Sequence, residues 1–125
     1  MSEEYATRLE ILVKARETIK SKKRWCKGSQ ARDAYGHACN YDHPNASIWC
    51  PLGAIFKAAD EIAVKSGDNN PMLVGLNAKK AIKILNIRTP DMQHITFFND
   101  SGGTKHKDVV KVFDNAIAAI RRIAS

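Results

Sequence analysis

The residue best suited to covalent chemistry is Cys50, which is followed at once by Pro51. Proline favours the first position of a helix, so we expect Cys50 at a helix amino end, where unpaired amide hydrogens and the helix dipole favour the thiolate. A cysteine nucleophile also needs a base and an orienting group. His106, with Asn99 and Asp100 before it, could supply both. This pattern would make the chain a small cysteine-dependent hydrolase or transferase.

The same residues also have a structural interpretation, which we favour. Cysteine is among the most buried residue types, and Trp49 beside Cys50 indicates a packed position. His106 falls in the first turn of the last expected helix, where a surface histidine is commoner than a catalytic base. Asn99 and Asp100 precede a Gly-Gly pair and are typical of a turn closed by hydrogen bonds to its own backbone. The thiol enzyme is therefore kept as the alternative function.

A second group of residues could bind a metal. All three cysteines fall within residues 26–50, and two of the four histidines lie among them. Structural zinc sites usually bring their ligands in close pairs such as Cys-x2-Cys, which this chain lacks. An odd number of cysteines without an export signal indicates reduced thiols. We predict no metal and no cofactor, and the alternative is a zinc site formed by Cys26, His37, Cys39 and His43.

Positive charge is concentrated in one segment. Residues 14–32 hold eight cations and one acid, whereas the rest of the chain has 12 of each. Such a focused field raises the local concentration of phosphates or of an acidic partner. A solvated helix end, where cations are favoured, is the plainer interpretation. The predicted binding residues are Lys20, Lys22, Lys23, Arg24, Trp25, Lys27 and Arg32.

Trp25 lies among these cations, an arrangement that suits stacking on bases together with neutralisation of phosphates. A tryptophan that covers the core is the favoured alternative. The sequence has no helix-turn-helix spacing, zinc finger or phosphate-binding glycine loop. We therefore predict a non-enzymatic binding module whose basic segment engages an acidic protein or a nucleic acid.

Helical periodicity accounts for most of the chain and indicates the elements that must position these residues. The residues expected to cap or begin the helices are Ser2, Pro51, Pro71, Thr89 and Thr104. The first helix should run from about residue 3 to about residue 21, and Gly67 should end the second. Residues 28–45 are rich in turn formers, with a short hairpin expected near Tyr35 and Gly36.

At 125 residues the chain is expected to form one domain, residues 1–125. The predicted fold class is all-α: a single compact domain of four to five helices, with a long irregular segment between the first two. No apolar run approaches the roughly 18 residues of a membrane span. The first 20 residues are charged throughout, unlike a signal peptide, so we expect a cytoplasmic protein without membrane contact.

Four short motifs occur in a fixed order along the chain. They are Ala31-Arg32-Asp33-x-x-Gly36, Trp49-Cys50-x-x-Gly53-Ala54, Asn99-Asp100 and Thr104-x-x-x-Asp108-Val109-Val110. Together they resemble an uncharacterised family of small bacterial and phage proteins, with a resemblance that covers most of the chain. The resemblance implies a grouping but no activity. Pro51 departs from the aliphatic residue expected after the cysteine of the second motif.

Overall fold

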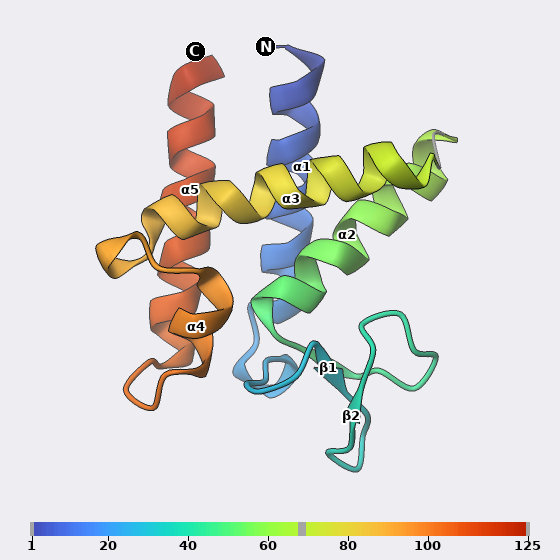
Figure 1. Cartoon of the computed structure of the whole chain (residues 1–125), viewed down its shortest axis with the longest axis vertical. Helices are drawn as coiled ribbons and strands as arrows, with labels where there is room; N and C mark the ends of the chain where they lie inside the picture. Colours follow the sequence, from blue (N-terminus) through green and yellow to red (C-terminus); the bar gives the residue numbers. More distant parts are fainter. Residues whose placement is uncertain (1, 68–69, 125) are drawn as a thin grey trace.

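Two long antiparallel helices, α1 (Glu3–Ile19) and α5 (His106–Ala124), lie side by side in the computed structural model (Figure 1). The structure describes residues 2–67 and 70–124. Helix α2 (Pro51–Ser66) packs against α1, and α3 (Pro71–Arg88) crosses both. Between α3 and α5 lie a 3-10 turn, η2 (Pro90–Met92), and the short helix α4 (Ile95–Asp100). The core lies among the four long helices, and its largest fully buried side chains include Phe113, Leu12 and Ile55.

The expected all-α fold is only partly right, because the chain also forms a small antiparallel sheet. Its strands are β1 (Ala31–Arg32), β2 (Ala38–Cys39) and β3 (Ile48–Trp49), in the order β2-β1-β3. Each strand has two residues, too few to produce the alternation by which a strand is recognised in a sequence. The fold is therefore mainly α, with five α-helices and one three-stranded sheet among the described residues.

The predicted hairpin between β1 and β2 is confirmed. Gly36 adopts a φ of 85°, the left-handed conformation that such a tight turn requires. The Asp33 side chain accepts hydrogen bonds from the amides of Tyr35 and His37, each at 2.9 Å. These bonds hold the pKa of Asp33 below its usual value. The turn residues thus specify the hairpin locally.

Most of the expected helix ends are confirmed. Ser2 accepts a hydrogen bond from the Tyr5 amide, Pro51 begins α2, and Gly67 ends it with a φ of 76°. Helix α1 ends at Ile19, two residues before the expected residue 21. The prediction that Thr104 caps the last helix is wrong, because α5 begins two residues later, at His106.

Helix α5 begins at His106, and the preceding residue, Lys105, donates its amide to the Asp108 carboxylate at 2.8 Å. The short helix expected after Thr89 is broken in two, because Asp91 and Met92 have positive φ angles that end η2.

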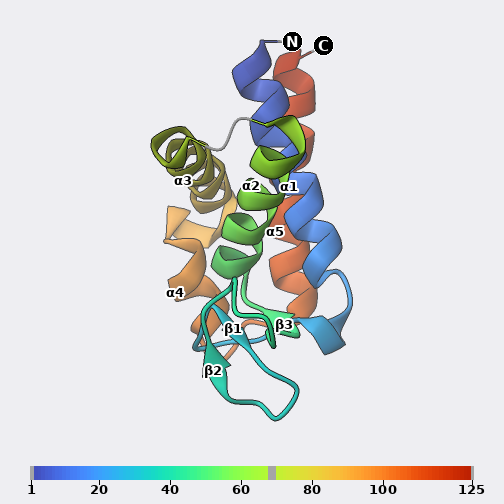
Figure 2. The ribbon, with the colours of Figure 1, turned by 90° about the vertical axis from the view of Figure 1, so that its right-hand side faces the viewer.

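The small sheet and the irregular segments next to it lie at one end of the molecule. Helix α1 begins and α5 ends at the opposite end (Figures 1 and 2). The sheet end, as we call it, comprises the sheet, the 3-10 turn η1 (Lys22–Arg24), and the connection between α4 and α5. No helix in the described part of the chain is long and apolar enough to cross a membrane.

Candidate functional site

Residues 25–28 are fastened to the end of α4 by the Asn-Asp pair. The Trp25 indole donates to Asn99 Oδ1 at 2.7 Å, and Asn99 Nδ2 donates to the Cys26 carbonyl at 3.1 Å. Asp100 Oδ1 accepts the Gly28 amide at 2.9 Å. Asn99 is completely buried, so its own bonds form with little competition from water, whereas the bond from Gly28 to Asp100 is exposed. The expected turn closed on its own backbone is therefore wrong, because the pair binds a segment more than 70 residues away.

Lys27 fixes the connection between α4 and α5. Its ammonium group donates to the carbonyl oxygens of Ser101, at 2.6 Å, and Thr104, at 2.7 Å. It also lies 5.7 Å from the centre of the Trp25 ring. Because its donors are used inside the protein, Lys27 is a structural residue and is not free for the binding role predicted from the sequence.

Cys50 caps α2, as the sequence indicates, but it does not form a catalytic pair. It is only 4% exposed, and its Sγ accepts the Gly53 amide at 3.4 Å. Burial raises the pKa of Cys50, against the partial opposing effect of nearby backbone amides, so the thiol form is favoured. His106 makes its contacts elsewhere, through Nε2 to the Ile19 carbonyl at 2.7 Å and through its ring to Trp25.

Gly53 allows α2 to approach closely the residue that precedes β1, Gln30. A Cβ atom at this position would lie 2.1 Å from the Gln30 carbonyl oxygen, far inside any normal contact. The same oxygen accepts the Cys50 amide at 3.0 Å. The Trp-Cys-x-x-Gly motif therefore builds a junction between the sheet and α2, and its glycine is required by packing.

The alternative zinc site is not assembled. His37 is bonded to Asp33, and His43 Nδ1 accepts the Asn45 amide. Cys26 is buried, and burial raises its pKa to about 11, which opposes the thiolate that zinc requires. In residues 2–67 and 70–124 no three His, Cys, Asp or Glu side chains are placed to hold a metal ion.

Acidic neighbours neutralise part of the basic segment. Lys14 pairs with Glu61 at 3.2 Å, from the neighbouring helix α2. Arg16 pairs with Asp114 of α5 at 2.5 Å. Lys20 pairs with Glu17 at 2.9 Å, and this contact lowers the pKa of the Glu17 carboxyl. These pairs reduce the local charge, and Lys20 is a weaker candidate for binding than the sequence indicates.

Arg32 and Trp25 are also engaged internally. The Arg32 guanidinium donates to the carbonyls of Gly36, at 3.1 Å, and Lys27, at 3.2 Å. Trp25 is half-buried, and its only N–H donor on the ring is bonded to Asn99. The interpretation of Trp25 as a lid on the core is therefore favoured over base stacking.

Three predicted binding residues remain available for a partner: Lys22, Lys23 and Arg24. All three are exposed on η1. Within the described chain none of them lies within ion-pair distance of an acid. Arg24 lies over the Trp49 ring, 5.6 Å from its centre, a contact that orients the guanidinium without neutralising it.

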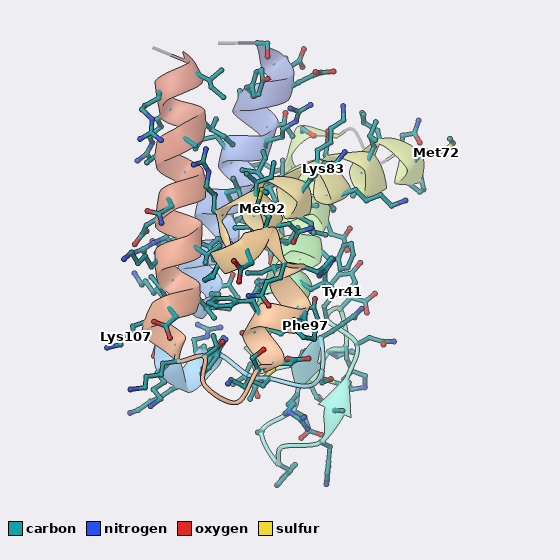
Figure 3. The ribbon with its side chains drawn as sticks, turned by 60° about the vertical axis from the view of Figure 1, so that its left-hand side comes forward. Tyr41, Met72, Lys83, Met92, Phe97 and Lys107 are labelled. Carbon is teal, nitrogen blue, oxygen red and sulfur yellow. The ribbon has the colours of Figure 1, made fainter. Side chains whose placement is uncertain are left out.

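Two cations from the far end of the sequence join this group. The contact between His106 and the Ile19 carbonyl brings the start of α5 to the end of α1. Lys105 and Lys107 flank His106 and are both exposed. Figure 3 shows Lys107 projecting outward from the first turn of α5, beside the light-blue segment that follows α1.

We call the five residues Lys22, Lys23, Arg24, Lys105 and Lys107 the basic end. Sequence reasoning missed its last two members, because only a tertiary contact brings the two segments together.

The chain matches the model of DUF6197, described as a family of unknown function, over residues 4–119. This match agrees with the resemblance at the level of an uncharacterised family that covers most of the chain. No curated protein and no solved structure matches the chain significantly.

Proposed function

The chain belongs to DUF6197, a family of unknown function, and we propose that it is a non-enzymatic binding module whose basic end engages an anionic partner. The partner is an acidic protein surface or the phosphate backbone of a nucleic acid. We also place the protein in the cytoplasm, where its three free thiols stay reduced.

The observation that carries the proposal is the grouping of exposed cations from two distant segments. Lys22, Lys23 and Arg24 come from η1, and Lys105 and Lys107 from the start of α5. At physiological salt, charges interact over about 8 Å, so cations on adjoining segments act on one partner together. Unpaired surface cations attract phosphates or carboxylates and increase the rate of encounter.

The support beneath the basic end is rigid, which lowers the entropy lost on binding. Lys27 and His106 fix the two segments to each other by hydrogen bonds of 2.6–2.7 Å. Preorganised groups bind more tightly than groups that must first be ordered. Trp25 is engaged inside the protein, so the contacts expected are with backbone phosphates or with carboxylates, and they carry no base sequence information.

The test is the salt dependence of binding to two probes, a short DNA duplex and polyglutamate, measured by fluorescence anisotropy between about 50 and 200 mM salt. The test variant carries Lys22→Ala, Lys23→Ala and Arg24→Ala. The matched control carries Lys65→Ala, Arg88→Ala and Arg121→Ala, which remove the same charge from separate exposed positions on α2, α3 and α5.

We expect the native protein to bind at least one probe. For DNA, the loss of three phosphate contacts should make the slope of log K against log salt shallower by about 2.7. The control should keep a slope close to that of the native protein. The absence of binding to both probes at low salt, or equal losses in the two variants, would show that the basic end is not the binding surface.

A further inference from the structure

The outward face of α3 carries a continuous stripe of exposed side chains. Its members are Met72, Leu76, Lys79, Lys83 and Ile87, spaced by four, three, four and four residues. This spacing places them on one side of a helix. Met72 is 84% exposed, Leu76 47% and Ile87 53%, which are high fractions for large apolar residues. We call these five residues the outer stripe.

The apolar surface continues beyond the end of α3. Met92 in η2 is 70% exposed and Phe97 in α4 is 68% exposed. Both elements contact α3. Figure 3 shows Met72, Lys83, Met92 and Phe97 following one another along a single side of the molecule. Large apolar side chains grouped in this way are uncommon on a surface without a partner.

The charge of this face has one sign. Helix α3 contains four cations, Lys79, Lys80, Lys83 and Arg88, and no acid. None of the four is ion-paired within residues 2–67 and 70–124. Asp91 in η2 is an exposed acid beyond the end of the helix. The outer stripe is thus apolar at both ends and cationic in the middle.

We propose that the outer stripe docks an amphipathic helix of a partner protein, with acidic side chains at the centre of its apolar face. Side chains that recur every three or four residues form the face through which two helices pack against each other. Acidic groups on the incoming helix would face Lys79 and Lys83, and apolar groups would cover Met72, Leu76 and Ile87. Methionine is flexible and polarisable, and it adapts to the side chains of different helices.

A second copy of this chain fits the face poorly. Pairing two outer stripes would bring Lys79 and Lys83 of one copy against the same lysines of the other. Like charges placed directly opposite each other destabilise a helix pair. The outer stripe also lies on α3 and not on η1 or the start of α5, so this inference goes beyond the function proposed for the basic end and can fail independently of it.

The experiment uses the full chain and a synthetic helical peptide as the probe. The peptide carries leucines on one face with two glutamates at the centre of that face. A peptide of the same composition in scrambled order is the control. Binding is measured by fluorescence anisotropy, and the folding of each variant is checked by circular dichroism. Vesicles containing anionic lipid form a separate arm, because a cationic apolar face can also bind a membrane surface.

We expect the amphipathic peptide to bind the native chain and the scrambled peptide to bind at least tenfold more weakly. The double variant Lys79→Glu, Lys83→Glu should lose about tenfold or more in affinity, since two attractive charge pairs become repulsive. A peptide with lysines in place of its two glutamates should restore binding to that variant. Lys65→Glu, Arg121→Glu, a charge-reversal control at exposed cations of α2 and α5 outside the outer stripe and the basic end, should leave the affinity unchanged.

Three results would overturn the proposal. The first is that the two peptides bind equally, and the second is that charge reversal on α3 has no effect. The third is binding to the vesicles without binding to the amphipathic peptide, which would identify a lipid surface as the partner of this face.

Discussion

The same substitution, glycine to alanine, should have opposite effects at two helical positions. In a helix interior alanine is usually more stable than glycine by about 0.5–1 kcal/mol, because it loses less backbone entropy on folding. At Gly75 in α3, no atom other than those of the adjoining residues and of the nearby α3 backbone lies within 4 Å of the position that a Cβ would occupy. Gly75→Ala should therefore stabilise the protein by about this amount.

At Gly53 the balance reverses. The added Cβ would lie 2.1 Å from the Gln30 carbonyl oxygen, so either α2 or the backbone that leads into β1 must move. Overpacking of this kind costs about 1–3 kcal/mol. Movement also strains the hydrogen bond from the Cys50 amide to the same oxygen, with a cost of about 1 kcal/mol. After the gain in helix propensity, we expect Gly53→Ala to destabilise the protein by about 2 kcal/mol.

The two variants are compared with the native protein by urea denaturation followed by circular dichroism. A loss of about 2 kcal/mol should also lower the melting temperature by about 8 °C in a domain of this size. Gly75→Ala serves as the matched control for the general effect of alanine in a helix. If Gly53→Ala is as stable as the native protein, the close approach of Gln30 to α2 is wrong.

Three further predictions concern the junction around the sheet end. Asn99→Leu leaves the Trp25 indole and the Cys26 carbonyl without partners, so it should lower the free energy of unfolding, measured by urea denaturation, by about 3 kcal/mol. An unchanged urea midpoint would contradict these hydrogen bonds. In the native protein, iodoacetamide at neutral pH should label half-exposed Cys39 before buried Cys50, as mapped by mass spectrometry. Rapid labelling of Cys50 would instead support the alternative function, a cysteine-dependent enzyme. Burial raises the folded-state pKa of Cys26 to about 11, above its ordinary value of 9.0, so the stability it contributes is fully present below pH 9 and is lost as pH rises to 11. Cys26→Ala should show a smaller fall in stability across this range, and identical pH profiles would contradict the assignment.

Features specified by neighbouring residues could be predicted from the sequence. Pro51 marked the start of α2, and with it the capping position of Cys50. Gly36 and Asp33 specify a hairpin through bonds that span at most four residues. In each case the interaction that fixes the structure is local, so a short stretch of sequence contains it.

The features that were missed depend on contacts between distant segments. Nothing near Asn99 in the sequence indicates that its side chain binds Trp25 and Cys26. Strand β3 is too short to have a pattern of its own and exists because it pairs with β1. A contact between distant segments also removes Lys27 from the predicted binding residues, because its ammonium group is bonded to carbonyls of the α4–α5 connection.

The central claim is that η1 and the first turn of α5 form one anion-binding surface. Backbone amide chemical shifts of the isotope-labelled native protein, recorded during titration with a polyanion, test this claim directly. The account predicts that residues 22–24 and 105–107 shift together with a common midpoint, while the exposed cations Lys65 of α2 and Arg121 of α5 stay unchanged. Shifts confined to one of the two segments, or spread equally over all cationic helices, would contradict it.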